Sequence, residues 1–102
     1  MGRGLSQLQR RILLLTLRER FVLCKDLLFL WGVQPGAVVD KGTYGAAHSA
    51  LSRTLTRLWW RGLIEIWQNK LTHYGTGVTL TKMGRGLAQA IFAKDQKEQV
   101  NG

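Results

Sequence analysis

The chain opens with apolar residues at the spacing of a helix. The stripe consists of Leu8, Ile12 and Leu15. Ser6 and Gln9 form a capping box at its start, in which each side chain can bond the backbone N–H group of the other. The pattern therefore predicts a first helix over residues 6–20.

The next segment changes character twice. Residues 21–23 are expected to form a brief extended link, and residues 25–31 are short and very apolar, which favours a second helix. Gly32 is a natural stop for that helix. Residues 33–43 contain a Pro-Gly pair and Gly42, so we expect a loop there.

Residues 46–61 have the clearest helical pattern in the chain, and Gly62 ends it. One face is apolar and consists of Ala47, Leu51, Leu55 and Leu58. At about 100° per residue, the opposite face carries Ser49, Arg53, Thr56, Arg57 and Trp60. The first face is expected to be buried and the second exposed.

After this helix the period of the pattern changes to two. Residues 63–68 alternate as in a strand, residues 69–77 are polar with glycine, and residues 78–80 predict a second short strand. The two strands are expected to pair as a hairpin. Thr81 then caps a last helix. Its apolar stripe is predicted to be Met83, Leu87 and Ile91.

The predicted order is helix, helix, helix, strand, strand, helix. This is a mainly α fold with a small β-hairpin, of the α+β class. A length of 102 residues is enough for one domain and too short for two. We expect a single domain over residues 1–102, with a core over residues 6–93 and a fraying polar tail over residues 94–102.

Charge narrows the class of partner. Lys and Arg number 15 against 6 Asp and Glu, for a net charge of +9. In a short chain, so large a positive charge favours nucleic acid or an anionic membrane surface as the binding partner. No segment approaches the ~20 apolar residues that span a bilayer, and we expect no membrane partner.

Residues with catalytic or metal-binding chemistry are few. Cys24 is the only cysteine, which excludes an intramolecular disulfide and predicts a reduced, cytoplasmic protein. It is expected to be a small buried apolar residue. His48 and His73 fit no metal-ligand spacing with it, and the acidic residues are scattered. We therefore expect no enzyme activity, no cofactor, no metal site and no small-molecule ligand.

Two segments resemble a known family. Residues 51–65, Leu-Ser-Arg-Thr-Leu-Thr-Arg-Leu-Trp-Trp-Arg-Gly-Leu-Ile-Glu, resemble the recognition helix and first wing strand of MarR-like winged helix-turn-helix transcriptional regulators. Residues 78–88, Val-Thr-Leu-Thr-Lys-Met-Gly-Arg-Gly-Leu-Ala, resemble their second wing strand and following helix. The resemblance covers roughly residues 7–92 and implies a winged helix domain that binds duplex DNA. The chain departs from the family in the long connection before its third helix.

The resemblance places the helix of residues 46–61 in the major groove. The residues expected to contact nucleic acid on it are Ser49, Ser52, Arg53, Thr56, Arg57 and Arg61. Arg53 is expected to donate two hydrogen bonds to guanine O6 and N7, whereas Arg57 and Arg61 lie further along and meet phosphate. The alternative is a solvated cationic face on a structural helix.

Residues 69–77 correspond to the wing of that family. Lys70 can pair with phosphate, and His73 and Tyr74 can hydrogen-bond the sugar or the DNA backbone. An ordinary polar hairpin loop is the alternative.

The two adjacent tryptophans are expected to differ in role. Trp59 lies near the rim of the apolar stripe and is expected to pack into the core or under the wing. Trp60 shares the face of Arg53 and is expected to make a protein contact. Its alternative is a cation–π contact with a neighbouring arginine.

Together these features predict sequence-specific binding of double-stranded DNA by a small prokaryotic or viral transcriptional regulator at the nucleoid. A homodimer is also expected, because one recognition helix reads few base pairs. Two other functions stay open. One is a winged helix that serves as a protein-interaction scaffold, and the other is a component of a replication or RNA complex that binds nucleic acid without sequence specificity.

Overall fold

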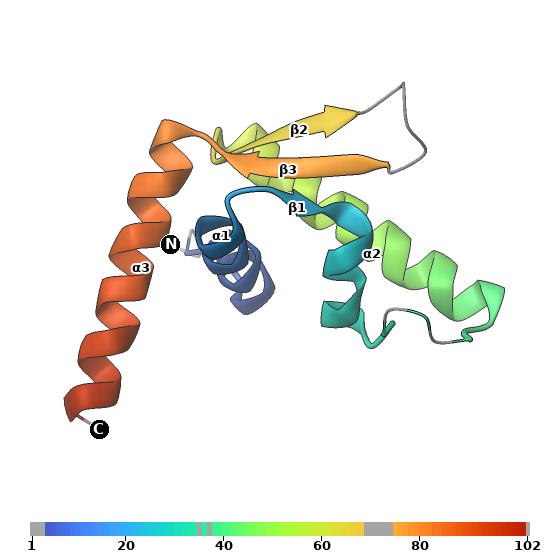
Figure 1. Ribbon diagram of the computed structural model, residues 1–102, viewed down its shortest axis with the longest axis horizontal. Helices are drawn as coiled ribbons and strands as arrows, with labels where there is room; N and C mark the ends of the chain where they lie inside the picture. The colour runs from blue at the N-terminus through green and yellow to red at the C-terminus, as the bar shows by residue number, and fades with distance from the viewer. Residues whose placement is uncertain (1–3, 35, 37, 69–74, 102) are drawn as a thin grey trace.

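The computed structural model describes residues 4–34, 36, 38–68 and 75–101. In chain order its elements are α1 (Gln7–Glu19), β1 (Val22–Leu23), the 3-10 helix η1 (Cys24–Trp31), α2 (Lys41–Trp60), β2 (Ile64–Gln68), β3 (Thr76–Leu80) and α3 (Lys82–Asn101). In Figure 1 the strands lie across the top of the molecule, with α1 below them, α2 behind them and α3 along one side. The predicted mainly α fold with a small antiparallel hairpin is confirmed.

The sheet has one strand more than the pattern predicts. Residues 21–23 do not form a simple link, because β1 pairs antiparallel with β3 and gives the strand order β1-β3-β2. In this pairing Val22 lies opposite Val78. So short a strand carries no alternating pattern that could reveal it.

The second strand of the hairpin is longer than expected, whereas the first, β2, begins one residue later than predicted. β3 begins at Thr76 and not at Val78, so Gly77 belongs to the strand and not to the loop. Gly77 is buried beneath Phe21, and a Cβ at this position would collide with the Phe21 ring. Glycine is therefore required here by the close approach of an aromatic ring and not by a turn.

α1 begins as predicted. The Gln9 N–H group donates to Ser6 Oγ at 3.1 Å, and the Ser6 N–H group donates to Gln9 Oε1 at 2.9 Å, so the capping box is confirmed. The buried residues are Gln9, Ile12, Leu13 and Thr16. The expected stripe is wrong in its edges, since Leu8 and Leu15 are only half-buried. α1 packs against both α3 and β3. Its buried face is therefore shifted by one residue along the sequence from the predicted stripe.

The second predicted helix is the 3-10 helix η1. It buries Leu27 and Leu28 against the core. Gly32 ends it in the left-handed conformation, with a φ of 85°, so the predicted stop is confirmed.

α2 begins at Lys41, before the expected start at Ala46, so the loop predicted for residues 33–43 is wrong at its end. Asp40 caps the helix, because its carboxylate accepts the Thr43 N–H group at 3.1 Å and the Thr43 hydroxyl at 2.6 Å. The Thr43 hydroxyl and N–H group lower the pKa of Asp40. This cap offsets the poor helix propensity of Gly42 and the other glycine of the first turns.

α3 is capped by Thr81, as predicted. The Gly84 N–H group donates to Thr81 Oγ1 at 3.0 Å, and the Thr81 hydroxyl donates to the Gly62 carbonyl at 2.6 Å. One threonine thus joins the end of α2 to the start of α3. Residues 94–101, expected to fray, continue the helix to Asn101.

The apolar stripe predicted for α3 is wrong for Met83 and Leu87, whereas Ile91 is half-buried against the core as its place in the stripe implies. Gly84 and Ala88 are buried, whereas Met83 and Leu87 are exposed. The reason is close packing: a Cβ on Gly84 would collide with the carbonyl oxygen of Leu63. Only small residues fit where α3 crosses this connection, so the larger side chains point outward.

Candidate nucleic-acid interface

The predicted contact face of α2 lies on the surface. The residues Ser49, Ser52, Arg53, Thr56, Arg57 and Arg61 are all exposed. The opposite face is buried as predicted, through Ala47, Leu51, Leu55 and Leu58. No acidic residue occurs among the 20 residues of α2. Within the described residues neither Arg53 nor Arg57 forms an ion pair, so this face offers unneutralised positive charge.

Hydroxyl groups on this face differ in what they can offer. The Thr56 hydroxyl donates to the Ser52 carbonyl at 2.8 Å, one turn back along α2. Its hydrogen is therefore occupied, and Thr56 can only accept a hydrogen bond from a partner.

The N-terminal half of α2 carries two aromatic rings, of which Tyr44 belongs to the helix only because α2 starts early. Tyr44 and His48 are exposed, and their rings stack at 6.1 Å with an angle of 27° between them. The sequence pattern did not indicate Tyr44 because this residue lies before the expected helix start at Ala46. The signal that could have found it is Asp40, because aspartate is among the preferred N-cap residues of helices.

Gly45 lies on the exposed side of α2. A Cβ built on Gly45 meets no atom within 4 Å. Packing within the described residues therefore does not require glycine here, although glycine inside a helix costs about 0.5–1 kcal/mol relative to alanine. The position leaves the helix backbone open to close approach by a partner.

A hollow of about 200 Å³ separates α2 from the hairpin. Ser52 and Thr56 line it from α2, and Gln68 and Thr76 line it from the strands. Cys24, also at this hollow, is only partly buried, although it was expected to be a buried apolar residue. Partial burial still raises the pKa of its thiol to about 11, so Cys24 is protonated at neutral pH.

Trp59 and Trp60 extend from the last turn of α2. Trp59 is 50% exposed, so the expectation that it packs into the core is wrong. The alternative, that it packs under the wing, involves residues outside those described. Trp60 is 76% exposed. Its ring meets Trp59 edge-on, with centroids 5.4 Å apart, and not Arg53 or Arg57. A cation–π contact is formed elsewhere, where the Arg11 guanidinium lies 6.0 Å from the centroid of the Phe29 ring.

The remaining candidates of the wing are Lys70, His73 and Tyr74. All three lie outside the described residues. β2 and β3 lead into this segment from Gln68 and out of it at Thr76.

The described part of the chain contains no group of three or more His, Cys, Asp or Glu residues that could hold a metal ion. Within the same ranges, none of the helices has the length and apolar character needed to cross a membrane.

Comparison with known proteins rests on structure. No protein-family model and no curated protein sequence matches the chain. A variant of Lactococcus lactis ZitR matches 99% of this chain with a TM-score of 0.71 and 15% identity. A MarR family transcriptional regulator from Silicibacter pomeroyi matches 98% with a TM-score of 0.71 and 19% identity. The Multiple Antibiotic Resistance Repressor, MarR, matches 97% with a TM-score of 0.66 and 19% identity.

The chain spans 60% of the ZitR structure, 61% of the Silicibacter pomeroyi regulator and 64% of MarR. The matches extend over nearly all of this chain and include α2, the hairpin and α3. The chain therefore has the fold of a MarR-like winged helix.

Proposed function

We propose that this protein binds double-stranded DNA in a sequence-specific way and acts as a small transcriptional regulator at the nucleoid. The observation that carries the proposal is the exposed face of α2, which has arginine and hydroxyl side chains and no acidic residue. B-DNA's major groove admits an α-helix. The structural neighbours include proteins named as transcriptional regulators, which supports the same role.

Only part of α2 can lie in the groove. Its 20 residues form a straight helix of about 30 Å, whereas the groove curves around the duplex, so the two ends of the helix cannot both stay at the groove floor. We assign base contacts to Arg53, with Ser49 and Ser52 beside it, because a guanidinium fork matches guanine O6 and N7. Arg57 and Arg61, nearer the C-terminal end, are assigned to phosphates.

The wing supplies the second contact in this proposal. Lys70 pairs with phosphate, and His73 and Tyr74 bond the sugar-phosphate backbone. Thr56 and the two hairpin strands face the hollow beside α2, so groove and wing contacts would come from the same side of the molecule.

The test is a competition titration of a selected site against a scrambled duplex of equal length. Arg53→Ala is expected to weaken binding to the selected site by about 1–3 kcal/mol and to the scrambled duplex much less. Arg53→Lys should restore little of that preference, because lysine lacks the planar fork. Lys70→Ala should weaken both duplexes about equally and reduce the salt slope by about one.

Repeating the titration at several salt concentrations measures the phosphate contacts. Neutralising about five phosphates should give a slope of log K against log salt near −4 to −5. Arg10→Ala, an exposed change on α1, is the matched control. Equal weakening of both duplexes by Arg53→Ala would make Arg53 a phosphate contact, and absence of binding at low salt would contradict the DNA proposal.

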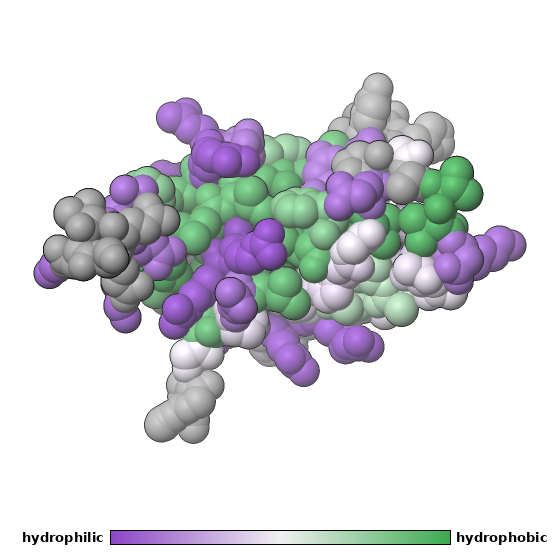
Figure 2. Space-filling view, turned by 90° about the horizontal axis from the view of Figure 1, so that it is seen from below, coloured by the Kyte–Doolittle hydropathy of each residue, from purple (hydrophilic) through white to green (hydrophobic). Residues whose placement is uncertain are grey.

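We further propose that the protein forms a homodimer through a groove of about 790 Å³ between α1, η1 and α3. Apolar side chains line it, namely Leu14, Leu15, Leu17, Phe29 and Phe92. Figure 2, seen from below relative to Figure 1, shows broad hydrophobic areas between scattered hydrophilic side chains. Arg11, Arg18 and Asp95 also line the groove. Opposite charges on one patch suit a two-fold interface, in which each patch meets its own copy.

A protein-interaction scaffold is the second candidate function. The exposed Trp59–Trp60 pair favours it, because tryptophan is enriched in interface hot spots. Under this alternative Trp60→Ala would abolish partner binding, and the protein would show no salt-dependent affinity for duplex DNA.

A further inference from the structure

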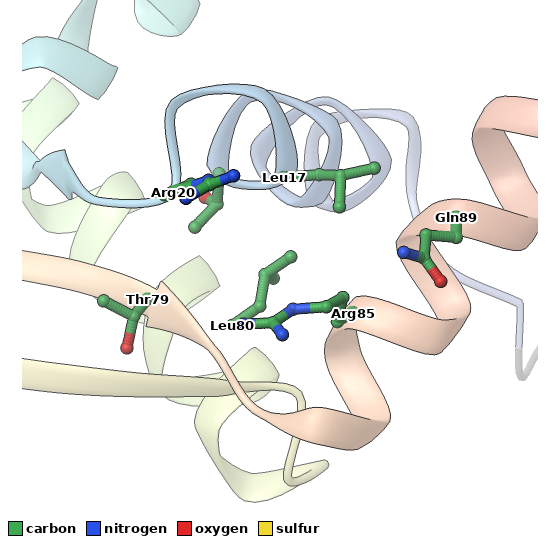
Figure 3. Close-up of a pocket in the computed structure, with 7 residues that line it drawn as sticks. Leu17, Arg20, Thr79, Leu80, Arg85 and Gln89 are labelled. Carbon is green, nitrogen blue, oxygen red and sulfur yellow. The ribbon is translucent and has the colours of Figure 1, made fainter.

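A second pocket lies on the other side of the sheet from α2. It encloses about 550 Å³ between the end of α1, the end of β3 and the first turns of α3. Figure 3 shows Arg20 and Arg85 extending toward this space from α1 and from α3, with Leu80 between them. Neither the proposed DNA contacts nor the proposed dimer groove uses these two arginines.

Most of the polar side chains that line the pocket can donate hydrogen bonds, but the Thr16 hydroxyl already donates to the Ile12 carbonyl at 2.7 Å and can only accept. The side chains of Arg20 and Arg85 form no ion pair or hydrogen bond within the described residues, and no carboxylate lines the space. Trp67 Nε1–H donates to Thr79 Oγ1 at 2.8 Å, so the Thr79 hydroxyl keeps its own hydrogen to donate. Gln89 adds an amide at the rim. This combination of donors suits an anion.

Arg20 is held in an unusual backbone conformation. It follows the last residue of α1 with a φ of 68° and a ψ of −41°, and its N–H group donates to the Thr16 carbonyl at 2.8 Å. It is the non-glycine residue with positive φ among those described. Glycine would adopt this conformation without strain. The arginine is thus kept at a position where the backbone favours glycine, and its side chain lines the pocket.

Charge and volume define the ligand. Two guanidinium groups, with no carboxylate among the residues that line the pocket, match a dianion. A phosphate monoester carries close to two negative charges at neutral pH, whereas a carboxylate carries one. The volume exceeds what a phosphate group alone would fill, and Leu17 and Leu80 give it apolar walls. We propose that this pocket binds the phosphate monoester of a small organic molecule, with Arg20 and Arg85 on the phosphate.

The test measures binding of three probes by calorimetry on the full chain: phenyl phosphate, benzoate and inorganic phosphate. Phenyl phosphate should bind at least about tenfold more tightly than either of the others, which corresponds to roughly 1.4 kcal/mol. Equal affinity for benzoate would contradict a dianion site, and equal affinity for inorganic phosphate would contradict an organic ligand. Absence of binding by phenyl phosphate would overturn the proposal.

Two variants and a control complete the experiment. Arg20→Gly and Arg85→Gln should each weaken phenyl phosphate binding at least about tenfold. Arg20→Gly should also keep or raise the melting temperature, because it relieves backbone strain, so lost binding would not reflect unfolding. Arg10→Gln, on an exposed part of α1 away from the pocket, should leave binding unchanged. An equal loss in the control would contradict the site.

A DNA phosphate is the other source of the same chemistry. Comparing the duplex DNA affinity of Arg20→Gly with that of the wild-type protein distinguishes the two sources. Unchanged DNA affinity supports a small-molecule pocket, and a loss as large as that for phenyl phosphate would assign Arg20 to the DNA surface and overturn the proposal. Failure of the wild-type protein to bind DNA would contradict only the function proposed above.

Discussion

At the scale of single residues, contacts distant in sequence decide what the local pattern cannot. Gly84 interrupts an apolar stripe in the sequence, yet it is the residue that α3 buries against Leu63. Met83 and Leu87 fit the helical period and remain exposed. The pattern could predict the helix and its Thr81 cap, because both depend on neighbouring residues. It could not predict the buried face, because that depends on how closely α3 approaches the connection after α2.

Gly84→Ala should destabilise the protein by about 1–3 kcal/mol, as expected for an added methyl group in a packed contact. Urea unfolding measures the change. Gly86→Ala is the matched control on the same helix, because a Cβ at Gly86 meets nothing within 4 Å. The control should be neutral or slightly stabilising. Equal midpoints for the two variants would contradict the close contact with Leu63.

The Cys24 thiol should react slowly in the folded protein. Its pKa is raised to about 11 by burial, so little thiolate exists at pH 8. Iodoacetamide labelling should therefore be slower in native protein than in urea. Since the folded pKa lies above the unfolded value, the contribution of Cys24 to stability is present below about pH 9 and is lost as the pH rises toward 11. Equal labelling rates in both states would contradict this environment.

At the scale of elements, the hydrophobic pattern of α2 predicts the orientation of the helix but not its first residue. Its buried and exposed faces are confirmed, because a repeat of apolar residues reports helix orientation directly. Its start is missed, because Gly42 and Gly45 lower helix propensity and so favour a loop in the sequence. The Asp40 cap outweighs them through two hydrogen bonds to Thr43. Capping signals therefore deserve more weight than glycine content in placing the start of this helix.

Gly45→Ala should affect stability and DNA binding in opposite directions. Alanine should stabilise the free protein by about 0.5–1 kcal/mol, since its Cβ meets open space within the chain. The same methyl group should weaken duplex DNA binding if α2 approaches the groove closely. Thermal unfolding and DNA titration measure the two effects, with Gly86→Ala as the control. Unchanged DNA affinity would mean that this turn of α2 does not approach the DNA closely.

At the scale of the whole molecule, the order of elements is predictable and their assembly only partly so. Helical and alternating periods predict the helices and the hairpin, and the resemblance in residues 51–65 and 78–88 predicts the winged helix. The third strand is missed because two residues are too few to show a period. The pocket at Arg20 and Arg85 is also missed, since it joins α1, β3 and α3 only after folding.

The proposed homodimer predicts self-association in solution. Sedimentation at micromolar concentrations should show a dimer for the wild-type chain and a monomer for Phe92→Asp, because a carboxylate in an apolar interface is strongly unfavourable. Phe92 is 51% exposed in the single chain, so the substitution should not disrupt folding. Trp60→Ala should remain dimeric. A monomeric wild-type protein, or dissociation by Trp60→Ala alone, would contradict an interface in this groove.

The pairing of β1 with β3 also bears on how the domain unfolds. The two strands come from opposite halves of the chain, and Val22 lies opposite Val78 in their ladder. These backbone hydrogen bonds cannot open by fraying of a local hairpin, because breaking them separates the N-terminal helices from the C-terminal part of the fold. Amide protons in this ladder should therefore exchange with solvent only when the whole domain opens, whereas those at the end of α3 exchange through local motion. The two residues of β1 thus make the N-terminal and C-terminal halves of the chain unfold as one cooperative unit.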